Sequence, residues 1–160
     1  MKKFIKAQWL EIKLLNENWE KYLSLTDIAR RNNPKLPASI IKSWLKNKST
    51  IEFLWNWEKE NNSDFNLDRF ESIRKLAWNS SFDLTVQKWI KETNAIWIIS
   101  KSWRYGWTFA HIDIALEFAS WMSEKLKSSI IEELEKWEQD DKLDDFGELD
   151  ISFKFKIVRI

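Results

Sequence analysis

The chain of 160 residues carries 26 Lys and Arg against 25 Asp and Glu, so its formal net charge is only +1, and 44% of its residues are hydrophobic. It contains no Cys and one His, which excludes disulfide frameworks, thiol nucleophiles and Cys/His zinc or iron–sulfur sites. No apolar run approaches the ~20 residues of a membrane helix, and the apolar stretch before Lys6 is too short for a signal peptide. We expect a compact cytoplasmic protein that contacts no membrane.

The N-terminal part predicts two β-strands. Apolar residues share one parity within residues 4–15, and residues 21–25 are again rich in apolar side chains. We expect the chain to turn between them, at residues 16–20. There, Asn18-Trp19 stands where a two-residue hairpin turn favours Asn-Gly, because both turn residues need a positive φ.

The next segment predicts a pair of short helices with a basic outer side. Thr26 is the expected cap of the first helix, which must end near Pro34, and Pro37 suits the first turn of the second, at residues 38–46. Residues 28–51 contain six cations and no carboxylate. Such a patch favours polyanions. The six cations are Arg30, Arg31, Lys35, Lys42, Lys46 and Lys48.

Three more helices are predicted before the next strands. Residues 49–52 fit a capping box, so the third helix should begin near Thr50 and run toward Glu60. A fourth covers about residues 67–77, and a short fifth begins near Thr85. All are too short to be stable alone, so their apolar faces must pack on other elements.

A β-hairpin with a basic tip follows. Two β-prone runs, residues 95–100 and 105–110, are separated by a short segment that carries Lys101 and Arg104. We expect this hairpin to lie like a wing beside the helix pair.

Two longer helices and a last strand complete the expected fold. The helices are predicted at residues 111–121 and 123–138, followed by an acidic loop at residues 140–150 and a half-buried strand from Ile151 to Ile157. The predicted fold class is therefore α+β, with short helices packed on a small antiparallel sheet. Two parts are expected, a folded domain at residues 1–138 and an acidic linker with a C-terminal strand at residues 139–160.

Five short sequence words occur in order along the chain: Tyr22-Leu23-Ser24-Leu25-Thr26-Asp27-Ile28-Ala29, Ile51-Glu52-Phe53-Leu54, Lys88-Trp89-Ile90, Arg104-Tyr105-Gly106 and Ala110-His111-Ile112-Asp113-Ile114-Ala115. In this order and spacing they resemble the KilA-N domain family, over Ile5 to Leu134. That family occurs in phages, large DNA viruses and bacteria, and it is similar to the fungal APSES domain. The resemblance implies a DNA-binding module, often in phage regulatory proteins such as antirepressors, without a known catalytic activity.

Trp is unusually frequent in this chain and Gly unusually rare. It contains 12 Trp and 2 Gly, whereas average usage would give roughly 11 Gly in a chain of this length. Trp stands where the family pattern tends to show Gly, and where turns or helix ends favour it. We infer that several Trp replace Gly, as when a UGA codon that the host reads as Gly is translated as Trp. The affected positions are Trp19, Trp55, Trp78, Trp97, Trp103 and Trp107, whereas Trp44, Trp57, Trp89 and Trp121 are expected core residues.

The residues offer no catalytic constellation. His111 and Asp113 have no nucleophile beside them in the sequence, and a His that caps a helix explains the pair better. One His with scattered carboxylates lacks the spacing of a metal site, and no Lys-Ser or Lys-Thr stands at the position that a phosphate-binding loop requires. We expect no enzyme, no cofactor and no small-molecule substrate.

The basic patch and the resemblance together predict a regulatory DNA-binding protein. Cations of the helix pair would neutralise phosphates, and the wing would reach the backbone or a groove. The polar and basic face of the second helix is the expected base-reading surface. The residues expected to contact DNA are Arg30, Arg31, Ser39, Lys42, Ser43, Lys46, Lys48, Lys101, Arg104 and Tyr105.

Two alternatives remain open. Before His111 the chain has 19 Lys and Arg against 12 Asp and Glu, a charge of +7, and from His111 onward it has 7 against 13, a charge of −6. In the first alternative, the acidic half and the apolar last strand bind a repressor or another copy of the chain, as an antirepressor does. The second alternative is stacking of RNA or single-stranded bases on aromatic residues, which the positions of Trp on apolar helix faces disfavour.

Overall fold

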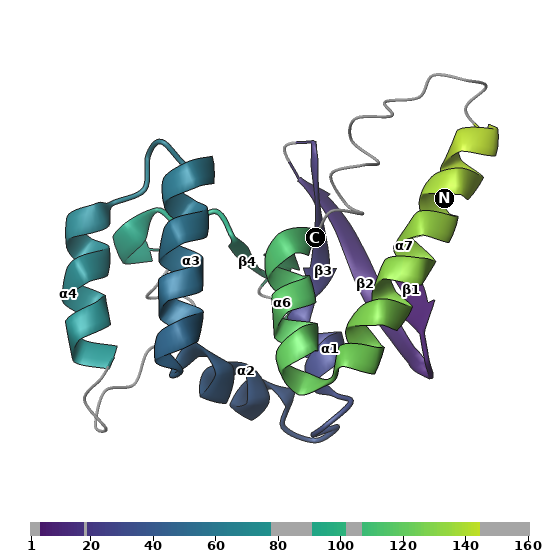
Figure 1. Cartoon of the computed structure of the whole chain (residues 1–160), viewed down its shortest axis with the longest axis horizontal. Helices are drawn as coiled ribbons and strands as arrows, with labels where there is room; N and C mark the ends of the chain where they lie inside the picture. The colour runs from purple at the N-terminus through teal and green to yellow at the C-terminus, as the bar shows by residue number, and fades with distance from the viewer. Residues whose placement is uncertain (1–3, 18, 78–90, 102–106, 145–160) are drawn as a thin grey trace.

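The computed structural model describes residues 4–17, 19–77, 91–101 and 107–144 (Figure 1). These residues form an antiparallel sheet of five strands, in the order β1-β2-β3-β5-β4, with helices packed around it. The α+β architecture predicted from the sequence is therefore confirmed. The strands are β1 (Phe4–Ala7), β2 (Leu10–Glu17), β3 (Glu20–Ser24), β4 (Ile98–Lys101) and β5 (Trp107–His111), and the helices are α1 (Leu25–Ala29), α2 (Pro37–Leu45), α3 (Lys48–Asn61), α4 (Leu67–Ala77), α6 (Ile112–Met122) and α7 (Glu124–Asp144).

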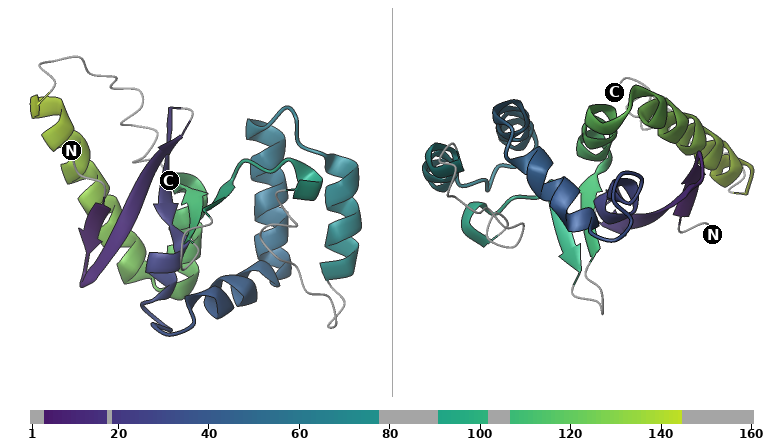
Figure 2. Two further views of the ribbon diagram at one scale, coloured as in Figure 1. Left: turned by 180° about the vertical axis from the view of Figure 1, so that it is seen from behind. Right: turned by 90° about the horizontal axis from the view of Figure 1, so that it is seen from below.

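The helices divide into two groups around the sheet. α6 and α7 pack on one another and on the strands, α6 on β3 and β5 and α7 on β1. α3 and α4 stand side by side away from α7, and α2 lies between them and α1 (Figures 1 and 2). The apolar faces of both groups belong to one continuous core.

The N-terminal segment contains one more strand than the sequence predicted. Instead of a single strand over residues 4–15, β1 and β2 form a hairpin in which Ala7 pairs with Leu10. Gln8, in the two-residue turn, has φ of 59°. The buried residues are odd-numbered in β1 and even-numbered from Leu10 onward. That change of parity is the sequence signal of the reversal, and the single-strand interpretation overlooked it.

The second hairpin has the turn that the sequence predicted. Glu17 pairs with Glu20 at its closed end. Trp19 in the turn has φ of 67°, and it is 98% exposed. A left-handed backbone is strained for every residue with a Cβ atom, so this position favours Gly, as the sequence analysis expected.

The cap of α1 is Ser24, not Thr26 as predicted. The Ser24 hydroxyl accepts a hydrogen bond of 3.0 Å from the backbone N–H of Asp27. Thr26 lies inside the helix, and its hydroxyl accepts a hydrogen bond of 3.0 Å from the N–H of Thr108 on β5. The helix also ends at Ala29, earlier than the limit set by Pro34, because the next amides bond in tight turns to the carbonyls of residues 28 and 29.

The next three helices largely follow the prediction. Pro37 is the first residue of α2, as expected, and α4 has the predicted bounds. The capping box predicted for α3 is not formed. α3 begins at Lys48, so Ser49 lies inside the helix and is not its cap, and the cap residue Asn47 makes no side-chain capping bond. The predicted fifth helix falls mostly on residues 78–90, outside the described part.

The C-terminal helices are confirmed, with one difference in length. The side chain of His111 caps α6, as predicted. α7 continues to Asp144, so the acidic loop expected from residue 140 is wrong for its first residues. Three of the five residues from 140 to 144 are Asp, which has a low helix propensity, so local propensity favoured a loop. Continuing an existing helix costs less than starting one, because each added residue forms one more backbone hydrogen bond. The predicted strand from Ile151 to Ile157 lies outside the described residues.

Aromatic side chains fill much of the core. Trp44 is fully buried, with its ring 5.0 Å from that of Phe118 and 6.1 Å from that of Trp97. Trp57 is also buried, as expected. Trp121 was expected in the core but is 47% exposed, because one face of its ring stacks on Phe118 while the other meets solvent.

Candidate nucleic-acid interface

α2 presents a polar face to solvent, as its periodicity predicted. Its apolar side, Ile41, Trp44 and Leu45, is buried against the core. A buried Trp in the last turn of the helix fixes the direction of the opposite face. The residues on that exposed face, here called the α2 surface, are Ser39, Lys42, Ser43 and Lys46.

Ser39 has a second role at the start of α2. Its hydroxyl donates a hydrogen bond of 2.8 Å to the carbonyl of Leu36 and accepts one of 3.4 Å from the side-chain amide of Asn33. These local bonds stabilise the turn before the helix. A DNA base that bonds to this hydroxyl would therefore have to compete with Leu36 and Asn33.

Arg30 is held by an acidic partner that the sequence analysis did not consider. Its Nη1 lies 2.9 Å from Oδ1 of Asp27, whose side chain is only 4% exposed. Lys13 on β2 reaches the same carboxylate, with a backbone N–H at 2.8 Å and Nζ at 3.9 Å from Oδ2. The two cations also lie over the ring of Trp107, Nζ of Lys13 at 3.7 Å and the guanidinium carbon of Arg30 at 4.6 Å from its centroid.

Asp27 is the anionic centre of this cluster. Burial raises the pKa of its carboxyl, and the N–H of Lys13 and the charges of Lys13 and Arg30 oppose that rise. The only charged residue of a fully buried five-residue helix was the sequence signal of the cluster. Its partner Lys13, 14 residues away, could not be identified from local periodicity.

Two further cations flank α2. Arg31 follows α1 and donates through Nε to the side chain of Gln8 at 3.5 Å and through Nη1 to that of Asn32 at 3.2 Å. Lys48 is the first residue of α3 and is exposed. Both lie next to α2 in the sequence, and both belong to the predicted contact set.

The two strands of the predicted hairpin are present as β4 and β5, and this strand pair is here called the wing. The two strands pair antiparallel, with Lys101 opposite Trp107. The tip, residues 102–106, is outside the described part, so the predicted contacts Arg104 and Tyr105 are not placed. The base of the wing is fixed to α1 by the bond from the N–H of Thr108 to the hydroxyl of Thr26.

α1 connects the elements that carry the described contact residues. It packs on both α2 and β5 (Figure 2). The wing is far from α1 and α2 along the chain, so the contact between α1 and β5 could not be predicted from the sequence.

His111 caps the start of α6. Its Nδ1 accepts a hydrogen bond of 3.1 Å from the N–H of Asp113, and Nε2 lies 3.1 Å from Oε2 of Glu20. Asp113 in turn accepts a bond of 3.0 Å from the indole of Trp57. Within the described ranges there is no group of three or more His, Asp or Glu that could hold a metal ion. None of the helices described is both long and apolar enough to cross a membrane.

The comparison with protein families gives one match. The model of the KilA-N domain matches residues 8–140, more than half of the chain. This range includes α1, α2 and both strands of the wing. Neither the curated proteins nor the solved structures gave a match.

Proposed function

Because the chain belongs to the KilA-N domain family, which is generally associated with DNA binding, we propose that it is a DNA-binding module of phage, viral or bacterial regulatory type. The family match is the observation that carries this proposal. The exposed polar face of α2 and the cations at its two ends support it, because a cationic surface next to a wing suits a duplex backbone.

The α2 surface is the proposed reading surface. Lys42 and Lys46 lie one turn apart on the outside of the helix, so both can reach phosphates along one strand. Ser43 lies between them on the same exposed side. Arg31 and Lys48 extend this cationic face beyond the two ends of the helix.

The wing supplies the second set of proposed contacts. Lys101, Arg104 and Tyr105 would reach the backbone or a groove next to the segment that α2 contacts. Arg30 contributes less than a freely solvated Arg would, because Asp27 and Trp107 already hold its guanidinium. We assign it a shared role, in the fold of the wing base and in phosphate binding.

The acidic helix α7 carries none of the proposed DNA contacts. It packs on β1 and α6 and carries eight Asp and Glu against four Lys. Such a surface repels phosphates. It remains the surface for the second candidate function, binding of a repressor or of a second copy in the manner of an antirepressor.

The test is the affinity for generic duplex DNA as a function of salt. If five or six phosphates are neutralised, log K should fall against log salt with a slope of about −5. The double variant Lys42→Ala/Lys46→Ala should reduce the size of this slope by about 2. Lys125→Ala, an exposed lysine on α7, is the matched control and should leave the slope almost unchanged.

Two outcomes would reject the proposal. An affinity that does not depend on salt excludes phosphate neutralisation as the source of binding. A folded protein that does not bind duplex DNA but sediments as a dimer, or binds a repressor, would favour the protein-interaction function. Competition with single strands tests the stacking alternative, because aromatic stacking requires unpaired bases.

A further inference from the structure

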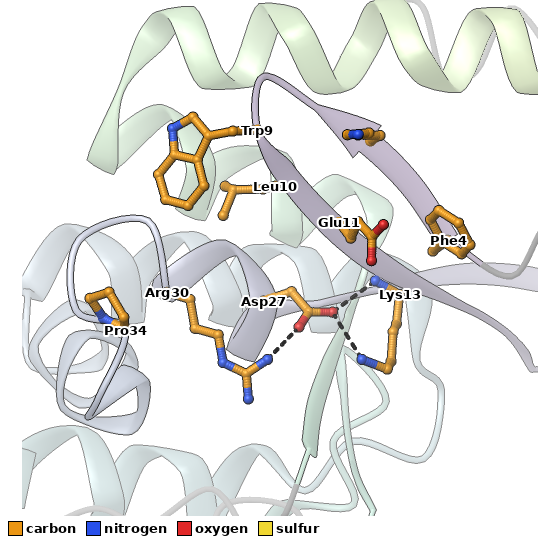
Figure 3. A pocket seen from close by; sticks show the side chains of 9 residues that line it. Phe4, Trp9, Leu10, Glu11, Lys13, Asp27, Arg30 and Pro34 are labelled. Carbon is orange, nitrogen blue, oxygen red and sulfur yellow. Dashed lines mark hydrogen bonds and ion pairs between the residues drawn. The ribbon is translucent and has the colours of Figure 1, made fainter.

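A hollow of about 530 Å³ lies between the β1–β2 hairpin, α1 and the loop that follows α1 (Figure 3). The sequence analysis assigned no role to it, and only one of its residues, Arg30, belongs to the predicted contact set. Its volume is in the range of ligand-binding sites. Its walls are made by the apolar residues Phe4, Trp9, Leu10 and Pro34 and by the charged residues Lys6, Glu11, Lys13, Asp27 and Arg30.

Two cations are already ordered in this hollow. Asp27 fixes Arg30 and Lys13 from one side, and the ring of Trp107 lies under both. The side chains of Arg30 and Lys13 are still 37% and 46% exposed. An anion that enters from solvent therefore meets cations whose side-chain entropy has largely been lost, which favours binding.

Lys6 adds a third cation from the edge strand. It is exposed, between the buried residues Ile5 and Ala7, so it stands on the face of β1 that points away from the core. Its cross-strand partner is Glu11 on β2. Three cations thus face two carboxylates, and Asp27, one of the two, is almost fully buried. The exposed surface of the hollow is therefore positive.

The hollow is continuous with the proposed DNA surface. Arg30 lines the hollow and also ends α1, next to α2. Trp107, under the two ordered cations, is the first residue of β5 and so belongs to the base of the wing. A strand that contacts α2 and the wing therefore passes close to the opening of the hollow.

We propose that the hollow binds a phosphate group of the DNA backbone, with Lys6 and Lys13 as contacts beside Arg30. This inference rests on the proposed DNA-binding function. The apolar walls Trp9 and Phe4 would pack against the sugar next to that phosphate. The surface that contacts DNA then extends from α2 across α1 to the first hairpin.

Two substitutions with opposite expected effects on DNA affinity test the proposal. Lys6→Ala should weaken duplex binding about eightfold at 0.1 M salt and reduce the size of the salt slope by about 0.9, the contribution of one phosphate. Glu11→Gln removes a carboxylate from the same hollow, so it should strengthen binding. Both residues are exposed, and thermal melting should show wild-type stability for both variants.

The control is Lys125→Ala, which removes an exposed lysine outside the hollow. Lys125 lies on α7, the helix that packs on β1. An equal loss in Lys6→Ala and Lys125→Ala would mean a general charge effect and would overturn the proposal. Wild-type binding by both hollow variants, while Lys42→Ala/Lys46→Ala weakens binding, would overturn it and leave the DNA-binding function intact. Absence of salt-dependent duplex binding by the wild type would reject both.

Discussion

Glu58 on α3 accepts hydrogen bonds of 2.8 Å from the backbone N–H groups of Ile96 and Trp97, just before β4. Its other oxygen accepts a bond of 2.7 Å from the side-chain amide of Asn62. The residue is fully buried, and burial raises the pKa of its carboxyl above the ordinary value. This carboxylate connects the helical group around α3 to the start of the wing.

Stability should depend on pH through Glu58. Because its pKa is higher in the folded than in the unfolded state, the folded protein binds a proton more readily, and lowering the pH relieves the cost of the buried charge. The free energy of unfolding of the wild type should therefore rise relative to that of Glu58→Gln as the pH falls from 7.5 toward 5. Urea unfolding at several pH values measures this difference. If the free energies of unfolding of the two proteins change equally with pH, the expectation is contradicted.

The cap of α6 should be sensitive to the acceptor at position 111. His111→Ala removes the acceptor of the Asp113 N–H and the contact with Glu20, and should lower the free energy of unfolding by about 1–2 kcal/mol. His111→Asn keeps a capping oxygen and should recover about half of that loss. Urea unfolding of the wild type and the two variants measures these free energies. Equal destabilisation by both substitutions would show that the packing of the ring, not the cap, is what matters.

The turn at position 19 should prefer Gly. Trp19→Gly relieves a positive φ and removes an almost fully exposed indole, so it should stabilise the protein by about 1 kcal/mol. Trp97→Gly is the contrast. Trp97 fills a fully buried site beside Trp44, which argues against the inference that it replaces Gly, and emptying this site should cost about 3–5 kcal/mol. Thermal melting measures both, and a Trp19→Gly variant less stable than the wild type would be inconsistent with strain in the turn.

The codon hypothesis has its own measurement. Mass spectrometry of peptides from the protein made in its natural host should find Gly at positions 19, 78, 103 and 107. Finding Trp at these four positions would disprove the hypothesis. The Trp107 contacts with Lys13 and Arg30 exist only where position 107 is Trp.

Asp27 should contribute more to the free energy of unfolding than an exposed carboxylate does, because it stabilises the base of the wing. Asp27→Ala leaves the N–H of Lys13 and the guanidinium of Arg30 without their buried acceptor, which should cost about 2–4 kcal/mol. Asp64→Ala removes an exposed carboxylate and should change the free energy of unfolding by less than about 0.5 kcal/mol. Urea unfolding compares them, and a similar small effect of both would mean that solvent replaces the Asp27 contacts.

Much of the local structure followed from the sequence alone. The periodicity of α2 predicted both its buried side and its exposed polar side, and α4 has the predicted bounds. The pattern around residue 111 predicted a His that caps a helix, and that cap is present. These features depend on neighbours within one or two turns of helix, which the order of residues determines directly.

Tertiary structure decided the contacts between distant residues. Ser24 rather than Thr26 caps α1, because the helix begins at Leu25, and the Thr26 hydroxyl accepts a bond from a residue 82 positions away. Asp27 joins Lys13 of β2 to Arg30 of α1, and this places an unpredicted cationic hollow beside the predicted DNA surface. Periodicity shows which face of an element is buried, but not which distant element covers it. The packing of the sheet on α1 made that choice, because a buried carboxylate must find cations and N–H donors wherever the fold brings them.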